Sequence, residues 1–399
     1  MNNMARLKIF NGKIITPYRI IPDGCVCIEN GKICEAVEKD VYFPDAILID
    51  AQGNYVSPGF IDIHTHGGGG HDFMDATVEA YLGAAEAHAK YGTTSLLPTL
   101  LTSATEELIS GFSVYKEAVK HNKRGAKFIG LHLEGPYFSY NQRGAQDPAY
   151  LRNPKPEEYN YILSRTDDIV RWSLAPELDG ALEFGKVLTA KNILPAIAHT
   201  DAIYEEAESA FQAGFTHITH LYSGMSTITR RNAFRYAGVL EAAYLIDDMT
   251  VEIIADGVHL PKPLLQFAYK FKGADKIALC TDSMRGAGMP DGESILGSLK
   301  NGRKVIIEDG VAKLLDRTAF AGSVATADRL VRTMIEIADV PLTDAVKMMT
   351  VTPAKIMKIN NKKGTIDVGK DADIVIFDKD IKILTTIIEG NVIYTNRDE

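Results

Sequence analysis

Eight apolar runs that read as β-strands occupy the middle of this 399-residue sequence, and segments with helical spacing separate them. The runs are FIDIHTH (60–66), TTSLLPT (93–99), FIGLHLE (128–134), VRWSLAPE (170–177), ILPAIAHT (193–200), HITHLYS (217–223), VEIIADGVH (251–259) and IALCTDS (277–283). The helical segments include 76–91, 104–123, 202–213 and 261–272. This alternation predicts an α/β fold with a parallel sheet closed into a (β/α)8, or TIM, barrel. A doubly wound sheet is the less favoured alternative, because no GxGxxG pattern follows the first strand.

The two ends of the chain have a different pattern. Residues 1–55 and 362–399 read as short strands of alternating apolar and polar residues, with turns at Asn-Gly, Gly-Lys and Gly-Asn pairs. Because both ends share this pattern, we expect them to pair into one small β-sandwich domain. The barrel then spans residues 56–361.

Composition limits the partners and the compartment. Lys and Arg number 43 against 52 Asp and Glu, and the net charge of −9 argues against nucleic acid or an anionic membrane as partner. No apolar stretch reaches the roughly 18 residues of a bilayer span, and MNNMARLKIF lacks the apolar core of a secretory signal. Three of the four cysteines crowd into residues 25–34, which fits neither a disulfide framework nor a zinc knuckle. We therefore expect a cytoplasmic protein with reduced thiols.

Candidate metal ligands lie at or near the end of five of the eight runs. His64 and His66 end the first run, and side chains at i and i+2 of a strand point the same way. Runs three, five, six and eight carry Glu134, His199, His220 and Asp282 at or near their ends. In a TIM barrel these strand ends meet at one face. Imidazole and carboxylate groups gathered there predict a divalent-metal site for Zn, Fe, Mn or Co, with room for a water molecule.

Three further roles follow from position. Asp282 suits a general acid/base that takes a proton from water and gives it to a leaving nitrogen; a plain metal ligand is the alternative. His217, three residues before His220, is expected to face the opposite side and to be structural. His132 lies deeper than Glu134 and is expected to support the site from below.

A series of motifs gives a more specific indication. PGFIDIHTHG, GLHLEGPY, THLYSGMS, IADGVHLP, TDSMRGAG and GTIDVGKDADIVIFD follow one another from about residue 55 to the C-terminus. In this order they resemble the amidohydrolase superfamily and, within it, the N-acetylglucosamine-6-phosphate deacetylase family. The resemblance implies a metal-dependent hydrolase that removes the acetyl group from an N-acetylated amino-sugar phosphate. It also implies a homodimer in which the neighbouring subunit completes the sugar-phosphate site.

The resemblance assigns roles to individual residues. Glu134, His199 and His220 would hold the principal metal, and His64 with His66 a second metal that some family members lack. Asp282 would be the proton donor and acceptor. The substrate-binding positions that it implies are Ala145, Gln146, Ser223, Gly224, Arg231, His259, Phe320, Ala321 and Gly322.

Some of these positions can be judged from chemistry as well. Arg231 offers a guanidinium that suits a phosphate, although two adjacent arginines also fit a solvated surface. His259 could donate to a phosphate or sugar oxygen, or be a further metal ligand. Many family members have Asn-Ala where Ser223 and Gly224 stand, and some have histidine in place of Gln146. Because Ser is shorter than Asn, we expect a direct hydrogen bond to phosphate to be lost or bridged by water.

Three alternatives remain at this stage. The substrate could be N-acetylgalactosamine 6-phosphate. A cyclic-amide hydrolase of the same superfamily is a second enzyme class, but such enzymes usually bridge two metals with a lysine on strand four, and VRWSLAPE has none. A metal-free binding protein on this scaffold is disfavoured, because every proposed ligand is present.

Overall fold

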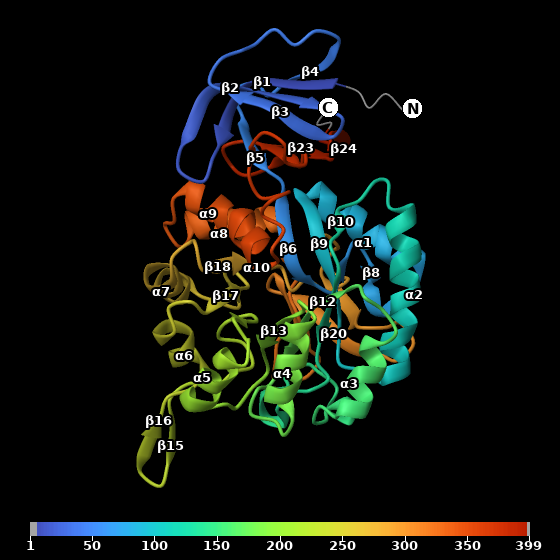
Figure 1. Ribbon diagram of the computed structural model, residues 1–399, viewed down its shortest axis with the longest axis vertical. Helices are drawn as coiled ribbons and strands as arrows, with labels where there is room; N and C mark the ends of the chain where they lie inside the picture. Colours follow the sequence, from blue (N-terminus) through green and yellow to red (C-terminus); the bar gives the residue numbers. More distant parts are fainter. Residues whose placement is uncertain (1–5, 397–399) are drawn as a thin grey trace.

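The computed structural model describes residues 6–396 as a (β/α)8 barrel capped at one end by a sheet (Figure 1). The barrel strands are β6 (Phe60–Thr65), β9 (Thr93–Leu100), β10 (Lys127–Phe128) with β11 (Leu131–Glu134), β12 (Ile169–Leu174), β13 (Leu194–Ile197), β14 (His217–Ile218), β17 (Thr250–Ile253) and β18 (Ile277–Leu279). Neighbouring strands pair in parallel, which confirms the eight predicted strand positions. The third position is interrupted between β10 and β11.

Backbone hydrogen bonds close the barrel between its last and first strands. The N–H of Asp282 donates to the carbonyl of His64 at 2.9 Å, and the N–H of His66 donates to the carbonyl of Ser283 at 2.8 Å. An open, doubly wound sheet has no such closure, so that alternative is excluded. The strands β6, β9 and β11 are buried on both faces, as parallel strands covered by helices must be.

Helices cover the outside of the barrel. The predicted segments form α1 (Val78–Lys90), α2 (Thr105–His121), α5 (Tyr204–Gln212) and α7 (Lys262–Lys272). The others are α3 (Pro156–Leu163), α4 (Ala181–Ala190), α6 (Val239–Leu245), α8 (Ala327–Glu336), α9 (Leu342–Met349) and α10 (Val351–Ile356). Thr77 caps α1 by accepting a hydrogen bond from the N–H of Ala80 at 3.1 Å. Within residues 6–396, no helix combines the length and the apolar character needed to cross a bilayer.

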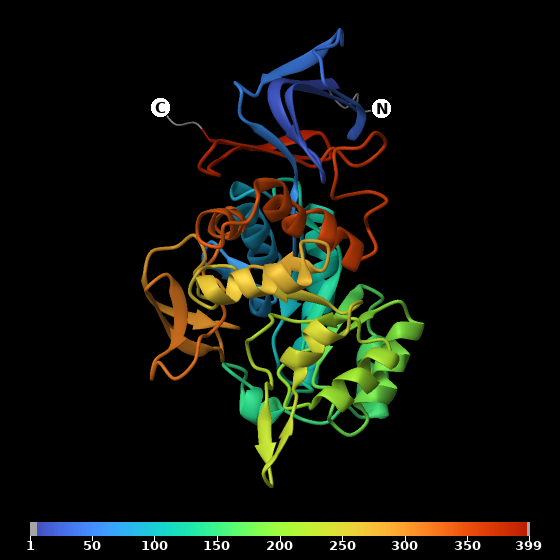
Figure 2. The ribbon, with the colours of Figure 1, turned by 90° about the vertical axis from the view of Figure 1, so that its left-hand side faces the viewer.

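The two ends of the chain form one sheet, here called the terminal sheet. Its strands are β1 (Arg6–Ile15), β2 (Ile20–Glu29), β3 (Lys32–Val37), β4 (Ala46–Asp50), β5 (Tyr55–Pro58), β22 (Ile374–Phe377), β23 (Ile383–Ile388) and β24 (Asn391–Thr395). β5 pairs with β22, and the two halves share one apolar core that includes Val26, Ile28 and Ile374 (Figure 2). Residues 1–5 and 397–399 of the expected small domain lie outside the described part of the chain.

The terminal sheet determines which end of the barrel is open. Gly59 follows β5 directly, and its N–H donates to the carbonyl of Asp373 at 2.9 Å. The amino end of β6 is thus attached to the terminal sheet, and the carboxyl ends of the barrel strands open at the opposite end. Two elements beyond that end were not predicted. One, here called the flap, comprises β19 (Gly292–Leu296), β20 (Arg303–Glu308) and β21 (Val311–Leu314), orange in Figure 2. The other is a projecting hairpin, β15 (Thr229–Arg231) and β16 (Phe234–Tyr236) (Figure 1).

Candidate active site

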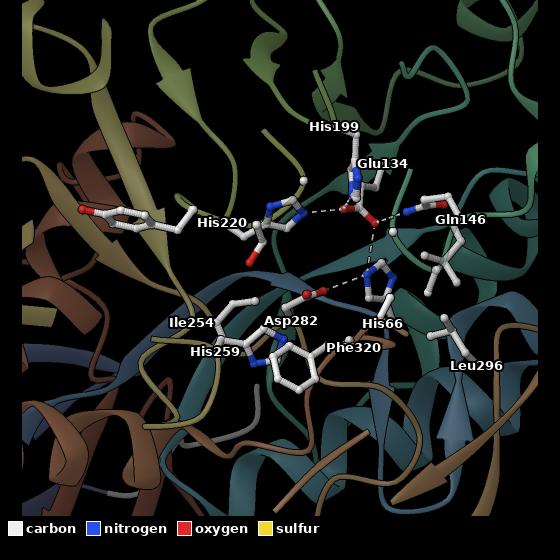
Figure 3. Close-up of a pocket in the computed structure, with 18 residues that line it drawn as sticks. His66, Glu134, Gln146, His199, His220, Ile254, His259, Asp282, Leu296 and Phe320 are labelled. Atoms are coloured by element: carbon white, nitrogen blue, oxygen red, sulfur yellow. Dashed lines mark hydrogen bonds and ion pairs between the residues drawn. The ribbon is translucent and has the colours of Figure 1, made fainter. Parts of the chain in front are cut away.

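A cavity of about 290 Å³ opens at the carboxyl ends of the barrel strands (Figure 3). Most residues predicted for the site line this cavity: His66, Glu134, Ala145, Gln146, His199, His220, Ser223, Gly224, His259, Asp282, Phe320 and Gly322. His64 is fully buried and in contact with residues that line it, and Ala321 is buried next to the lining residues Phe320 and Gly322. Arg231 lies elsewhere, exposed on the β15–β16 hairpin. The strand ends therefore converge as expected, and the predicted phosphate cation is the exception.

Glu134, the last residue of β11, lies at the centre of the site. Its Oε1 is 3.2 Å from Nε2 of His199 and 3.0 Å from Nε2 of His220. Its Oε2 is 3.3 Å from Nε2 of His66 (Figure 3). One carboxylate thus lies between two pairs of histidines, one from β6 and one from the ends of β13 and β14.

Hydrogen bonds at Nδ1, on the ring edge away from Glu134, orient three of the four histidines. Nδ1 of His64 lies 2.7 Å from Glu252 Oε1, and Nδ1 of His199 lies 2.7 Å from the carbonyl of Gln142. Nδ1 of His66 lies 3.2 Å from a carbonyl of β9. Carbonyl and carboxylate oxygens only accept, so each Nδ1 carries the hydrogen and each Nε2 of a neutral ring presents a lone pair to the cavity.

The donor set fits a divalent cation. Lone pairs of imidazole and carboxylate that face one another repel unless protons or a metal ion lie between them. Two groups of ligand atoms lie within 4.8 Å of one another, and they share Glu134: one adds His64 and His66, the other His199 and His220. Nε2 of His64 is 3.3 Å from Nε2 of His66. Tetrahedral ligands about 2.05 Å from zinc are also about 3.3 Å apart.

Asp282 faces the histidine pair of β6. Its Oδ1 is 3.0 Å from Nε2 of His66 and 3.3 Å from Nε2 of His64. Burial alone would raise the pKa of Asp282, but the two histidines outweigh burial and lower it. For Glu134, burial again acts upward, and the surrounding histidines hold its pKa well below the usual range. Both carboxylates are therefore ionised at neutral pH.

Three of these site residues have strained backbone conformations. His199, His220 and Asp282 have φ values of 46°, 28° and 45°, in the left-handed region that non-glycine residues rarely adopt. Each lies two or three residues beyond the end of its strand, at the point where the chain turns away. Such strain persists only where surrounding contacts enforce it, and it concentrates at functional sites.

The loop of residues 139–146 forms one wall. Asp201 holds this loop by accepting hydrogen bonds from Ser139 Oγ and Gln142 Nε2, both at 2.7 Å. Gln146 at its end donates through Nε2 to Glu134 Oε2 at 2.8 Å, and its Oε1 accepts from the N–H of Thr102 at 3.1 Å. Both ends of the Gln146 amide are thus engaged within the protein. In this structure Gln146 orients Glu134.

His259 and Gly224 also line the cavity. Nδ1 of His259 donates to Asp256 Oδ2 at 2.8 Å, and its ring packs on Phe320 with centroids 4.6 Å apart. Gly224 has φ of 58°, and a Cβ there would lie 2.7 Å from Nδ1 of His199. Alanine at this position would therefore press on a proposed metal ligand. This close approach explains why glycine stands here.

Two charged residues inside the barrel strands were not predicted from the sequence to support the site. Arg171 of β12 and Glu252 of β17 are fully buried, and they form an ion pair beneath the cavity. The available signal was one charged residue inside each of two apolar runs, VRWSL and VEIIA. Because a buried charge requires a partner, two opposite charges at such positions indicate a pair.

Comparison with known proteins agrees with this geometry. The sequence profile described as the amidohydrolase family matches residues 55–393. The chain belongs to the amidohydrolase family. This amidohydrolase is 32% identical to the N-acetylglucosamine-6-phosphate deacetylase of Haemophilus influenzae, over 96% of its own length and 98% of the relative. It is 30% identical to the N-acetylgalactosamine-6-phosphate deacetylase of Escherichia coli, over 86% of its length and 89% of the relative.

Solved structures show the same likeness. The crystal structure of N-acetylglucosamine-6-phosphate deacetylase from Pasteurella multocida superimposes on this amidohydrolase with a TM-score of 0.90. The two chains are 29% identical, and the match covers 98% of this chain and 100% of the other. The likeness therefore includes both the barrel and the terminal sheet.

Proposed function

We propose that this amidohydrolase hydrolyses the acetamide of N-acetylglucosamine 6-phosphate to give glucosamine 6-phosphate and acetate. The observation that carries the proposal is the placement of ionised Asp282 within 3.3 Å of two histidines that, with Glu134, form a candidate metal site. Amide hydrolysis needs an electrophilic centre for the carbonyl and a base for water; a cation held by these residues would supply the first, and Asp282 would supply the second. The names of its relatives indicate the sugar phosphate.

In this proposal Glu134, His199 and His220 would hold one divalent cation, and His64 with His66 would hold a second. Zn, Fe, Mn or Co would suit these nitrogen and oxygen ligands. Such an ion supplies a Lewis acid that polarises the amide carbonyl and lowers the pKa of water. Asp282 accepts the water proton on a carboxylate oxygen and then delivers it to the amine nitrogen as the C–N bond breaks. Gln146 keeps Glu134 in its orientation throughout.

The remaining lining residues would bind the sugar and its phosphate. His259 is oriented by Asp256, which leaves its Nε2 available to a substrate oxygen. Ser223, Gly224 and Ala145 line the cavity, and Phe320 offers an apolar face to the sugar (Figure 3). Ala321 and Gly322 continue the backbone from Phe320.

A phosphate carries nearly two negative charges, yet no Lys or Arg among residues 6–396 lines the cavity. We propose that a homodimer supplies the missing cation, with Arg231 on the hairpin of one subunit reaching the site of the other. Exposed apolar side chains near the hairpin support a subunit contact. Phe234 on the hairpin is 72% exposed, and Leu245 of α6 and Phe271 of α7 are 67% and 57% exposed.

The division of the chain and its compartment are part of the proposal. Residues 56–361 form the catalytic domain, while 1–55 and 362–399 form the small domain. The cytoplasm supplies phosphorylated sugars, and the free cysteines at positions 25, 27, 34 and 280 suit a reducing compartment.

Two other substrate classes fit the site to different degrees. N-acetylgalactosamine 6-phosphate is the second candidate, because one relative is named for it. A cyclic amide is less suitable. Strand β12 contains no lysine to bridge two metals, and its charged residue, Arg171, is a cation without a lone pair that is paired with Glu252.

Acetate release tests the proposal directly. The metal-reconstituted protein would be assayed for acetate with N-acetylglucosamine 6-phosphate, its galactosamine epimer and unphosphorylated N-acetylglucosamine, and for ring opening with dihydroorotate. We expect rapid turnover of the first substrate and much slower turnover of the unphosphorylated sugar. Preference for the epimer would transfer the assignment to the second candidate. Failure with all four substrates, with metal bound, would refute the proposed reaction.

A further inference from the structure

A buried ion pair lies directly beneath the cavity. Arg171 of β12 donates from Nη1 to Glu252 Oε2 at 2.6 Å and from Nη2 to Glu252 Oε1 at 2.9 Å. Both side chains are completely buried. Two parallel bonds between guanidinium and carboxylate fix the orientation of both planes. Burying both charges is costly, which points to a role for the pair beyond stability.

The pair contacts both segments that carry the proposed metal ligands. Glu252 Oε1 accepts from Nδ1 of His64 at 2.7 Å and from the backbone N–H of His220 at 3.3 Å. Arg171 binds the residues that precede the same two histidines. Its Nη1 donates to the carbonyl of Ile63 at 3.0 Å, and its Nη2 donates to Thr219 Oγ1 at 2.8 Å. Ile63 and Thr219 immediately precede the two histidines.

The same position could be mistaken for a metal site, because ligand atoms of His64, Glu252 and Cys280 lie within 4.8 Å of one another. Both carboxylate oxygens of Glu252 already accept from the guanidinium, which would repel a cation. Burial also raises the pKa of the Cys280 thiol well above its usual value, so the thiolate that a metal prefers is disfavoured. The cluster is suited to holding His64, not an ion.

We infer that Arg171 and Glu252 are positioning residues for the proposed metal centre. Glu252 fixes the hydrogen of His64 on Nδ1, which leaves Nε2 as a lone pair facing Glu134 and Asp282. Through the N–H of His220, the same carboxylate supports a backbone with φ of 28°. The pair thus sets the geometry of one histidine from each ligand group. This inference rests on the proposed function for its consequence in catalysis, but not for its consequence in metal binding.

Cobalt titration of the metal-free protein tests the inference without an activity assay. The variant Glu252→Gln keeps the side-chain shape but removes the charge. We expect the dissociation constant of the most weakly bound cobalt to rise about 10- to 100-fold, with a changed visible spectrum of bound cobalt. Glu252→Asp, which keeps the charge, should recover part of that loss. Wild-type cobalt affinity and spectrum in Glu252→Gln would overturn the inference.

A second buried ion pair provides the matched control. Lys363 Nζ lies 2.5 Å from Asp373 Oδ2 beside the terminal sheet, far along the chain from any proposed ligand. Lys363→Met should lower the melting temperature and leave cobalt binding unchanged. If it weakened cobalt binding as much as Glu252→Gln, the effect would be general destabilisation and the inference would fail.

Two further measurements distinguish a variant that does not fold, and a wrong proposed function, from a wrong inference. If Glu252→Gln does not fold, the double variant Arg171→Met with Glu252→Leu removes both charges together and is expected to fold. Its cobalt affinity should still fall, and unchanged affinity would overturn the inference. If the wild type shows no deacetylation while the variants lose cobalt, the proposed function is wrong and the positioning role stands.

Discussion

Asp282 is the residue whose replacement most directly tests the chemistry. Asp282→Asn keeps the size of the side chain but cannot accept the water proton. We expect kcat for acetate release to fall about 10²- to 10⁴-fold, the usual contribution of a general acid/base, with little change in KM. Steady-state kinetics would measure both constants.

The control for this variant is Asp309→Asn, which alters an exposed carboxylate at the turn of the flap. Its kcat should match that of the wild type. Full turnover by Asp282→Asn at normal metal content would show that another group moves the proton.

The histidines of β6 predict a pH dependence for the metal-free protein. Burial lowers the pKa of His64, but the carboxylates around it, Asp282 first, outweigh burial and raise it to about 9. The pKa of His66 is likewise raised well above its usual value. An unfolded histidine has a pKa near 6.5. The folded state therefore keeps protons that the unfolded state loses, and this stabilisation is complete below about pH 6.5 and lost as pH rises through 9.

Between pH 7 and 8 the free energy of unfolding of the metal-free protein should fall, by on the order of 1 kcal/mol per histidine. Urea denaturation would measure it. The prediction is limited to this range because burial lowers the pKa of Lys272 to about 8. Above that pH the folded state loses a proton that the unfolded state keeps, and this raises the free energy of unfolding again. Zinc-loaded protein should lack this fall, since the ion displaces the protons. A rise in stability over the same window would contradict the assignment.

At the residue scale, the sequence was informative where chemistry and strand position coincide. The i, i+2 spacing of His64 and His66 was enough to place both rings at one site. The same alternation rule was wrong for His217, which is buried with Nε2 3.3 Å from Glu252 Oε2. β14 ends at Ile218, and the positive φ of His220 breaks the alternation between the two histidines.

At the scale of elements, the flap depends on one buried arginine. Arg285 donates to the carbonyls of Ile295 and Gly297 in and beside the flap, at 2.9 and 2.7 Å. On the barrel side it is 2.9 Å from Asp75 Oδ1 and 3.1 Å from the carbonyl of Gly70. The flap in turn supplies Leu296 to the cavity wall. Arg285 therefore links this wall to the barrel.

Replacing Arg285 by Met should loosen the flap. Breaking a buried pair on one side costs about 3 to 5 kcal/mol, so we expect a clear loss of stability. Hydrogen exchange should quicken in residues 292–314 and not in β6 or β9. KM should rise more than kcat falls, because the flap strands contain none of the proposed metal ligands.

Arg317→Met is the matched control for this element. Arg317 lies just after β21, and its ion pair with Glu308 is exposed, so its removal should change stability by less than about 1 kcal/mol. Equal exchange rates in the two variants would refute the role given to Arg285.

The barrel strands could be predicted because each is an apolar run of limited length that ends in a polar group. The flap strands alternate apolar and polar residues weakly, and Arg303–Glu308 contains as many charged as apolar residues. β15 and β16 are only three residues long and exposed, so no hydrophobic pattern marks them. Their positions depend on contacts that a single sequence does not reveal.

At the scale of the whole molecule, the proposed exchange of Arg231 between subunits can be tested by mixing two defective proteins. Arg231→Ala lacks the cation and Asp282→Asn lacks the base. A mixed dimer has one site with both groups, the Asp282 of one subunit and the Arg231 of the other. With random exchange at equal amounts, about a quarter of the sites should recover activity, since a two-fold dimer contains two equivalent sites.

Recovery would be measured as acetate release at low substrate concentration, after the subunits have been exchanged. The unmixed variants incubated in the same way are the controls. If Arg231 served the site of its own subunit, mixing would restore nothing. A monomer in solution would also exclude this arrangement.

The pairing of β5 with β22 affects how the chain folds during translation. Strands β1 to β5 leave the ribosome first, and β5 can pair with β1 at once, yet its other edge finds β22 only after some 300 further residues. The barrel can assemble in the meantime, because its eight strands are contiguous between these two strands. The nascent chain must therefore carry an unfinished sheet edge throughout most of translation, and a ribosome that stops early releases a barrel with that edge uncovered.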